Sequence, residues 1–434
     1  MKNTILKSTL VLAMFTLPFI ASAVVAATVI HAGSLIDSTS NKVIQKATVI
    51  ITDNKITAIN QGFTEGASED TVIDLSDYTL MPGFMDMHTH ISSQNNGPAS
   101  YMEGFTLNEA DFTIKGVMYA EKTLMAGFTT IRNLGDRYNE SVALRNAINK
   151  GMVKGPRIYT AAKSIATTGG HADPTNGMAS GAYMYPTAED GVINGPYDAY
   201  AAVRQRYKDG ADGIKLTVTG GVLSVAKSGD NPQFTAEEVA SVVNAAKDYG
   251  MWVAVHAHGA EGMKRAVIAG VNSVEHGTFM TEKVMDLMIK NGTYYVPTIS
   301  AGEFVAEKAK IDNYFPDIVR PKAASVGPQI AATFEKAYKR GVKIAFGTDA
   351  GVQAHGTNWR EFVYMSENGM PPIETIKAAT IETAKLLSID MTHGSITVGK
   401  VADLVAVKGN PLNDMNLMQN ISFVMKGGEN VFSD

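Results

Sequence analysis

A short unit recurs between about residue 120 and residue 350, and it limits the folds that this chain can adopt. Each unit has a helical stretch, a glycine and a short β-branched run that ends in a polar residue, as in AGFTTIRN (126–133), AGVNSVEHG (269–277) and RGVKIAFGTD (340–349). Glycine is the usual residue just after the last turn of a helix. Strands that alternate with helices predict βα units and a parallel sheet.

Eight such strands are predicted, which is the number in a (β/α)8 barrel. They lie near residues 80–88, 128–132, 157–161, 213–217, 252–256, 272–276, 294–298 and 344–349. The alternation also fits a doubly wound open sheet, but no Gly-rich dinucleotide fingerprint opens a helix here. Thr235 and Glu238 predict a capping box for the helix over 235–250. We expect an α/β chain whose main domain is a TIM-like barrel.

Both ends of the chain follow a different pattern from the middle. Residues 27–62 and the tail from 394 alternate apolar and polar side chains around turns, which is typical of antiparallel strands. The simplest arrangement pairs both ends in one small β-sandwich domain, formed by 24–80 and 391–434 around a barrel over 81–390. Two separate β-tails are the alternative.

The first 23 residues have the pattern of a secretory signal peptide. Lys2 and Lys7 flank the apolar run LVLAMFTLPFI (10–20), and Ala21-Ser22-Ala23 follows as an A-x-A cleavage site. The run is shorter than the roughly 20 residues of a membrane span. We therefore expect export to the periplasm or medium, without a membrane anchor. The absence of cysteine excludes disulfides and thiolate metal sites, and a net charge of -5 without a basic run argues against nucleic-acid binding.

Polar residues that bind metals gather at the predicted strand ends. Only nine histidines occur in the chain, and four of them end predicted barrel strands. Active sites of barrel enzymes lie at the carboxyl ends of the strands, so six side chains should converge there: His88, His90, Lys215, His256, His276 and Asp349. Residues two apart on a strand face the same way, so His88 and His90 can hold one ion. Imidazole and carboxylate ligands suit zinc first, and manganese, cobalt or nickel as alternatives.

Several of these segments resemble the amidohydrolase superfamily of metal-dependent hydrolases. The resemblance rests on MPGFMDMHTH (81–90), EHG (275–277), GTDAG (347–351) and GSITVGKVADLVAV (394–407). More narrowly, TTIRNLG, TGGH, KLTVTGGVLS, VHAHGAEG and TDAGVQAHG resemble its prolidase-like and carboxypeptidase-like branch, which includes ochratoxin-hydrolysing amidases.

The resemblance implies a centre of two divalent metal ions. His88, His90 and Asp349 would bind the first ion, His256 and His276 the second, and a Lys215 carboxylated by carbon dioxide would bridge both. Burial can lower the pKa of a lysine by several units, which makes the neutral amine available to carbon dioxide. The alternatives for Lys215 are that it reaches the barrel rim or pairs with a carboxylate.

The resemblance also implies the chemistry and the substrate contacts. Water activated by the metals would attack a carbonyl, and Asp349 would carry the proton to the leaving amine. His171 and His258 are expected to face the substrate. Arg132 is expected to contact a substrate carboxylate, with an internal salt bridge as the alternative.

The leading hypothesis is an exported hydrolase that cleaves a peptide or amide bond next to a free carboxylate. Dipeptides, N-acyl amino acids and ochratoxin-type amides would be its substrates, and relatives imply a homo-oligomer. One alternative is a cyclic-amide hydrolase or deaminase of the same superfamily, such as an imidazolone hydrolase, with a single metal. The other is a binding protein on a degenerate barrel.

Overall fold

Strands from both ends of the chain form one seven-stranded sheet. The computed structural model describes residues 26–179, 181 and 185–433, so the expected signal peptide lies outside the described residues. The sheet has the order β16-β15-β14-β4-β1-β2-β3. Its strands are β1 (Thr28–Ile36), β2 (Val43–Thr52), β3 (Lys55–Gln61), β4 (Thr71–Pro82), β14 (Leu404–Lys408), β15 (Ile421–Lys426) and β16 (Glu429–Ser433).

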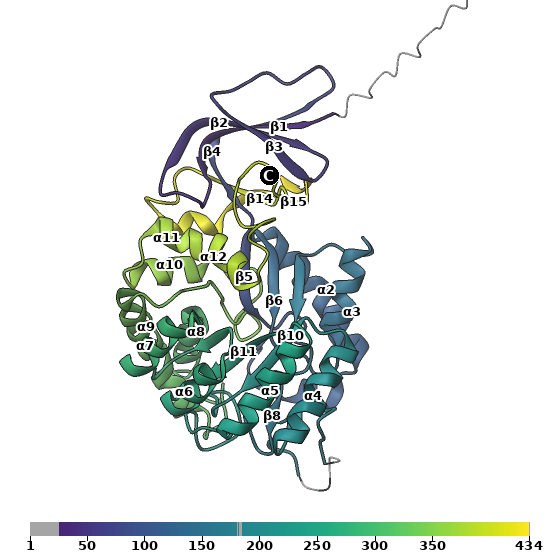
Figure 1. The fold of residues 1–434 in the computed structure, drawn as a ribbon, viewed down its shortest axis with the longest axis vertical. Coiled ribbons are helices and arrows are strands. Elements are labelled where there is room, and N and C mark those ends of the chain that lie inside the picture. Colours follow the sequence, from purple (N-terminus) through teal and green to yellow (C-terminus); the bar gives the residue numbers. More distant parts are fainter. Residues whose placement is uncertain (1–25, 180, 182–184, 434) are drawn as a thin grey trace, which may run out of the picture.

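The join between the two ends lies at β4, which pairs with β1 on one side and with β14 on the other. A core of fully buried side chains covers this sheet, among them Ile30, Leu35 and Phe423. The expected sandwich of two sheets is not confirmed, because all seven strands belong to a single sheet. In Figure 1 this sheet forms one end of the molecule and the α/β body forms the other.

The α/β body holds two main parallel sheets. One has the order β5-β6-β7, from β5 (Phe84–Thr89), β6 (Phe128–Asn133) and β7 (Arg157–Thr160). The other has the order β10-β11-β12-β13, from β10 (Gly213–Thr217), β11 (Trp252–Ala257), β12 (Ser273–His276) and β13 (Tyr294–Val296). A pair of short strands, β8 (Ala166–Thr167) and β9 (Val192–Ile193), lies between them in the chain.

Helices follow or flank most of these strands. They are α1 (Pro98–Thr106), α2 (Glu109–Met125), α3 (Glu140–Asn149), α4 (Pro196–Asp209), α5 (Ala236–Asp248), α6 (Ala260–Ala269), α7 (Glu282–Asn291), α8 (Ile299–Lys308), α9 (Arg320–Arg340), α10 (Arg360–Glu367), α11 (Pro372–Ala378) and α12 (Ile381–Leu386). A short 3-10 helix spans Met415–Gln419. The capping box of Thr235 and Glu238 is confirmed at the start of α5. Gly210, Gly270, Gly292 and Gly341 end α4, α6, α7 and α9 in the left-handed conformation that glycine adopts readily.

A closed eight-stranded barrel is not confirmed. The predicted last strand, 344–349, forms only one isolated bridge, from Ile344 to Tyr295, and Ala350 directly after it forms another to Thr89. Asp349 has a φ of 57°, which interrupts the extended backbone that a regular strand requires. The amide of Asp349 still donates to the carbonyl of His88 at 2.7 Å, so this segment stays beside β5. Seven of the eight predicted strands therefore form, and the eighth contributes an irregular segment at the same place.

No helix in the described part of the chain is long and apolar enough to cross a membrane.

Candidate metal centre

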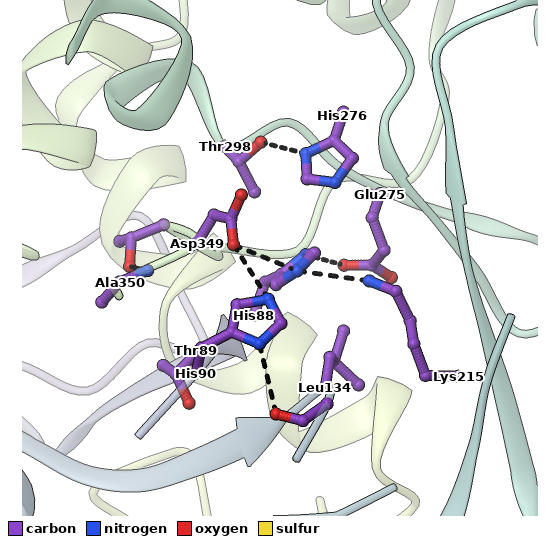
Figure 2. Close-up of polar contacts among 12 residues, drawn as sticks. His88, Thr89, His90, Leu134, Lys215, Glu275, His276, Thr298, Asp349 and Ala350 are labelled. Atoms are coloured by element: carbon purple, nitrogen blue, oxygen red, sulfur yellow. Dashed lines mark hydrogen bonds and ion pairs between the residues drawn. The ribbon is translucent and has the colours of Figure 1, made fainter. Parts of the chain in front are cut away.

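Two histidines at the end of β5 face Asp349. The Nε2 atoms of His88 and His90 lie 3.4 and 3.2 Å from Oδ1 of Asp349 (Figure 2). His88 is 1% exposed, and the side chain of His90 is 29% exposed. Among the described residues, Oδ1 of Asp349 has no partner with hydrogen-bond geometry. Three potential metal-ligand atoms, Nε2 of His88, Nε2 of His90 and Oδ1 of Asp349, thus lie close together without a hydrogen bond of standard geometry between them.

The proton on His88 is held by a buried carboxylate. Nδ1 of His88 lies 3.0 Å from Oε2 of Glu275 on β12, and Nη2 of Arg132 on β6 donates to Oε1 of Glu275 at 2.9 Å. Both Arg132 and Glu275 are fully buried. A carboxylate beside Arg132 accepts rather than donates, so Nδ1 of His88 carries the proton and Nε2 keeps its lone pair.

Backbone carbonyls set the protons of two further histidines. Nδ1 of His90 lies 3.3 Å from the carbonyl of Gly135, and Nε2 of His256 on β11 lies 3.0 Å from the carbonyl of Gly220. A carbonyl can only accept, so each of these ring nitrogens donates. Nε2 of His90 and Nδ1 of His256 are then free to bind a cation.

His276 ends β12 and lies between the other rings. Its ring centre is 4.9 Å from that of His88 and 4.7 Å from that of His256. Nδ1 of His276 lies 2.8 Å from the Thr298 hydroxyl. The backbone of His276 has a φ of 69°, which is unusual for a residue other than glycine. The Tyr295 hydroxyl donates to the His276 carbonyl at 2.8 Å, which holds this turn in place.

Lys215 on β10 is a buried amine beside these rings. It is 3% exposed, and its Nζ lies 3.2 Å from Nε2 of His88 (Figure 2). No carboxylate of the described residues forms an ion pair with it. Burial lowers the pKa of Lys215 to about 8. The side chain therefore neither reaches the rim nor pairs with an acid, which were the two alternatives for it.

The protonation states suit a divalent cation. Burial drives the pKa of His88, His256 and His276 well below the usual range, so these imidazoles are neutral at pH 7. Burial opposes ionisation of Asp349, but His88, His90 and the Lys215 amine together hold the pKa of this carboxyl below its usual value. Ligand atoms of His88, His276 and Asp349 all lie within 4.8 Å of one another. Neutral imidazoles with an ionised carboxylate are a donor set for zinc and similar metals.

One cavity of about 190 Å³ brings the six predicted residues together. His88, His90, Lys215, His256, His276 and Asp349 all line it. Apart from these residues and two further histidines its wall is mostly apolar, with Val222, Val305, Val326 and Ile330 among its side chains. A mostly apolar wall with a few convergent polar groups is typical of a ligand or cofactor site.

The match to known families covers most of the chain. Residues 79–431 match the model of the amidohydrolase family. The chain belongs to the amidohydrolase family. The resemblance stated from the motifs is therefore confirmed, and this amidohydrolase is a hydrolase that acts on C–N bonds.

Three relatives place this amidohydrolase within the family. Ochratoxinase of Aspergillus niger is 30% identical over 372 residues, which are 81% of this chain and 75% of the fungal protein. A Xaa-Pro dipeptidase solved with bound methionine in its active site is 62% identical, with a TM-score of 0.92 over 94% of this chain and all of that one. A prolidase solved with N-methylphosphonate-L-proline is 28% identical, with a TM-score of 0.85 over the same shares.

His171 and His258 of the amidohydrolase line the same cavity as the six. The His171 ring packs on the His256 ring at 4.3 Å between centres, and its buried Nδ1 has no partner among the described residues. Nδ1 of His258 lies 2.6 Å from the Thr278 hydroxyl. Both histidines line this cavity, and their role as substrate contacts stays a prediction.

Arg132 is placed differently from the expected substrate contact. It is fully buried and does not line this cavity. Its guanidinium donates to the Met87 carbonyl at 2.7 Å, to the Ser273 hydroxyl at 3.0 Å and to Glu275. The internal ion pair, which was the alternative, is the arrangement found.

Glu275 is the residue that sequence reasoning missed in this amidohydrolase. It precedes His276 in SVEH, a strand whose four residues are all buried. A charged residue inside a fully buried strand requires a partner, and that is the signal that could have identified it.

Proposed function

We propose that this amidohydrolase cleaves a peptide or amide bond next to a free carboxylate, as a dipeptidase or carboxypeptidase does. The observation that carries the proposal is the single cavity that holds all six predicted metal-site residues. The similarity of the chain to a Xaa-Pro dipeptidase and to a prolidase supports peptides as the substrate class. N-acyl amino acids and ochratoxin-type amides belong to the same class of bond, and the similarity to ochratoxinase supports them.

The donor set supports two divalent ions, with zinc as the first choice. His88, His90 and Asp349 would hold one ion, and His256 and His276 would hold the other. When bound, such ions polarise a carbonyl and lower the pKa of water towards ~7. The chain contributes neutral imidazoles whose protons already point away from the shared space, which reduces the rearrangement that binding requires.

Lys215 would be carboxylated and shared by both ions. Its neutral amine adds carbon dioxide, so that an N–C bond forms, one proton leaves and an anion with two oxygens results. Support comes from the 3% exposure of Lys215 and from the lack of an acidic ion-pair partner for it among the described residues. Protein loaded under ¹³C-bicarbonate should show a carbamate carbon signal that Lys215→Gln lacks. A wild-type spectrum without that signal would contradict the carbamate.

Asp349 would move the proton of the reaction. Its carboxylate lines the cavity beside His88 and His90, where it would accept a proton from the attacking water. Asp349 would then pass the proton to the leaving nitrogen as the C–N bond breaks. His171 and His258 would hold the substrate near Asp349, since all three residues line the same cavity.

A substrate screen combined with a metal count tests this function. The enzyme, purified after zinc loading, is assayed against dipeptides, N-acyl amino acids and cyclic amides, and its metal content is measured by mass spectrometry. We expect two ions per chain and hydrolysis of linear amides that end in a carboxylate. A single ion with hydrolysis confined to cyclic amides or purines would favour the imidazolone-hydrolase alternative. The paired substitution His88→Asn and His90→Asn should abolish turnover. A wild type without turnover, together with a double variant that binds the ligand as the wild type does, would favour a binding protein.

Export is proposed on the sequence of residues 1–23. Its apolar run between Lys7 and Ala21-Ser22-Ala23 supports cleavage after Ala23. Amino-terminal sequencing of the protein from the periplasm or medium should begin at Val24. Full-length protein retained in the cytoplasm would contradict export. A homo-oligomer rests on the family resemblance alone, and light scattering of the mature protein would test it.

A further inference from the structure

A second and larger cavity opens directly beside the metal-site cavity. Its volume is about 650 Å³, against about 190 Å³ for the first. The two cavities share His90, Ser164, Ala172, Leu223 and Val352 as lining residues. A substrate with its scissile bond near His90 can therefore extend into both. The smaller cavity suits an apolar side chain, and the larger one is lined by polar and charged residues.

A substrate carboxylate needs a cation that is not already occupied. Arg132, the expected partner, is enclosed in its ion pair with Glu275. Lys322 on α9 donates to the carbonyls of Gly221, Ser224 and Ala226 at 2.8–3.0 Å, and it lines neither cavity. Among the described residues, Arg137 and Lys163 are the lysine and arginine side chains that line the larger cavity.

Lys163 is the freer of these two cations. The guanidinium of Arg137 is exposed and donates to the Gly104 carbonyl at 2.8 Å. The half-buried ammonium of Lys163 has no hydrogen-bond or ion-pair partner anywhere in the described ranges. Lys163 also comes directly before Ser164, which lines both cavities.

The backbone that carries Lys163 is fixed on three sides. The carbonyl of Lys163 accepts from Nε of the buried Arg206 at 2.9 Å. The Asp136 amide donates to the Ala162 carbonyl at 3.0 Å, and the Ile165 amide donates to the carbonyl of Lys215 at 2.8 Å. The segment is therefore attached to the strand of the metal-site lysine, and only the Lys163 side chain is left to move.

The acidic residues of the larger cavity are engaged elsewhere. Glu140 accepts from the Ser92 hydroxyl and from two backbone amides, and Glu103 pairs with Lys115 at 2.7 Å. Asp190 accepts from Thr187. Burial and the neighbouring Glu140 raise the pKa of Asp136 to about 7, so this carboxyl carries only part of a charge at neutral pH. None of the four forms an ion pair with Lys163 among the described residues.

We propose that Lys163 binds the free carboxylate of the substrate in the larger cavity, while the apolar cavity takes the adjoining side chain. This inference rests on the proposed function, because it names the group that selects the substrate at that site. An ammonium bound to a carboxylate makes a charge-assisted hydrogen bond, which a carboxamide cannot match. The enzyme should therefore prefer the free acid to its amide through Lys163.

The test compares one dipeptide with its carboxamide. Steady-state kinetics are measured for a dipeptide that ends in methionine and for the same dipeptide with a terminal carboxamide. The quantity followed is the ratio of the two kcat/KM values. In Lys163→Gln this ratio should fall about tenfold or more, mainly through a higher KM for the acid. Lys163→Arg, which keeps the charge, should restore most of it.

Control variants separate the possible outcomes. Lys154→Gln, which removes an exposed lysine, should keep the wild-type ratio. A ratio that is unchanged in Lys163→Gln, or that falls in Arg137→Gln instead, would overturn the role of Lys163 and leave the proposed function intact. A wild-type enzyme that cleaves none of the dipeptides and N-acyl amino acids, as acids or as amides, would overturn the proposed function, and with it this inference.

Discussion

The two sides of the candidate metal centre are supported by different kinds of group. On the side of β5, His88 donates to Glu275, which is paired with Arg132, and all three are 0–1% exposed. On the side of β11 and β12, His256 donates to the Gly220 carbonyl and His276 contacts the Thr298 hydroxyl. On the first side His88 therefore depends on buried charges, whereas His90 on that side and both histidines of the other side depend on neutral groups.

This difference indicates which side of the metal centre should be the more rigid. A carboxylate fixes the proton of His88 on Nδ1, whereas the hydroxyl of Thr298 can donate or accept and leaves the proton of His276 adjustable. Buried charges are costly unless they remain paired, so the arrangement around His88 should be rigid and intolerant of change. The side of His276 should adapt to substitution at a lower cost.

The largest expected effect follows removal of the carboxylate that faces His88 and His90. Asp349→Asn cannot accept a proton, so kcat should fall by about 10²–10⁴-fold. The measurement is kcat at saturating zinc, together with the metal content of each variant. Full activity with both ions bound would exclude the role of Asp349 in moving the proton.

Breaking the buried ion pair should destabilise the protein more than any change beside His276. Glu275→Leu leaves the Arg132 guanidinium buried without its partner, which should lower the free energy of unfolding by about 3–5 kcal/mol. Urea unfolding of metal-free protein measures this. The double variant Arg132→Met with Glu275→Leu removes both charges and should recover most of the loss. A single variant as stable as the wild type would show that the pair contributes no rigidity.

These same residues mark what could be predicted from the sequence. The repeated unit was enough to predict that the six site residues lie near strand ends, because a strand of five residues and the glycine before it are local features of the sequence. The pair between Arg132 and Glu275 joins positions 143 apart in the chain, and only the packed strands bring them together. The left-handed backbone of Asp349 was equally beyond local patterns, since contacts with β5 hold it, and it is the reason that the last predicted strand is irregular.

A milder change removes the charge of Glu275 and keeps the size of its side chain. Glu275→Gln keeps the shape of the side chain but offers one acceptor oxygen for His88 and Arg132 together. Zinc affinity should fall by about 10–100-fold, as it does when the partners of metal-binding histidines are changed. Competition with a chelator gives this affinity without an activity assay. Glu275→Asp serves as the control that keeps the charge, and affinity equal to the wild type in Glu275→Gln would mean that Glu275 only fills space.

The smallest effect is expected at Thr298, and it decides whether the two sides differ. Thr298→Val removes the hydroxyl from Nδ1 of His276 and keeps the branched shape at a backbone position whose φ is 52°. A neutral hydrogen bond contributes about 0.5–1.5 kcal/mol, so zinc affinity should fall only about two- to tenfold. The same chelator competition measures it, with Thr298→Ser as the variant that retains the hydroxyl. If Thr298→Val weakened zinc binding as much as Glu275→Gln does, a neutral partner would fix its histidine as firmly as a charged one. The His88 side would then have no special place in the centre, because the buried charges around it would add nothing that a hydroxyl does not supply.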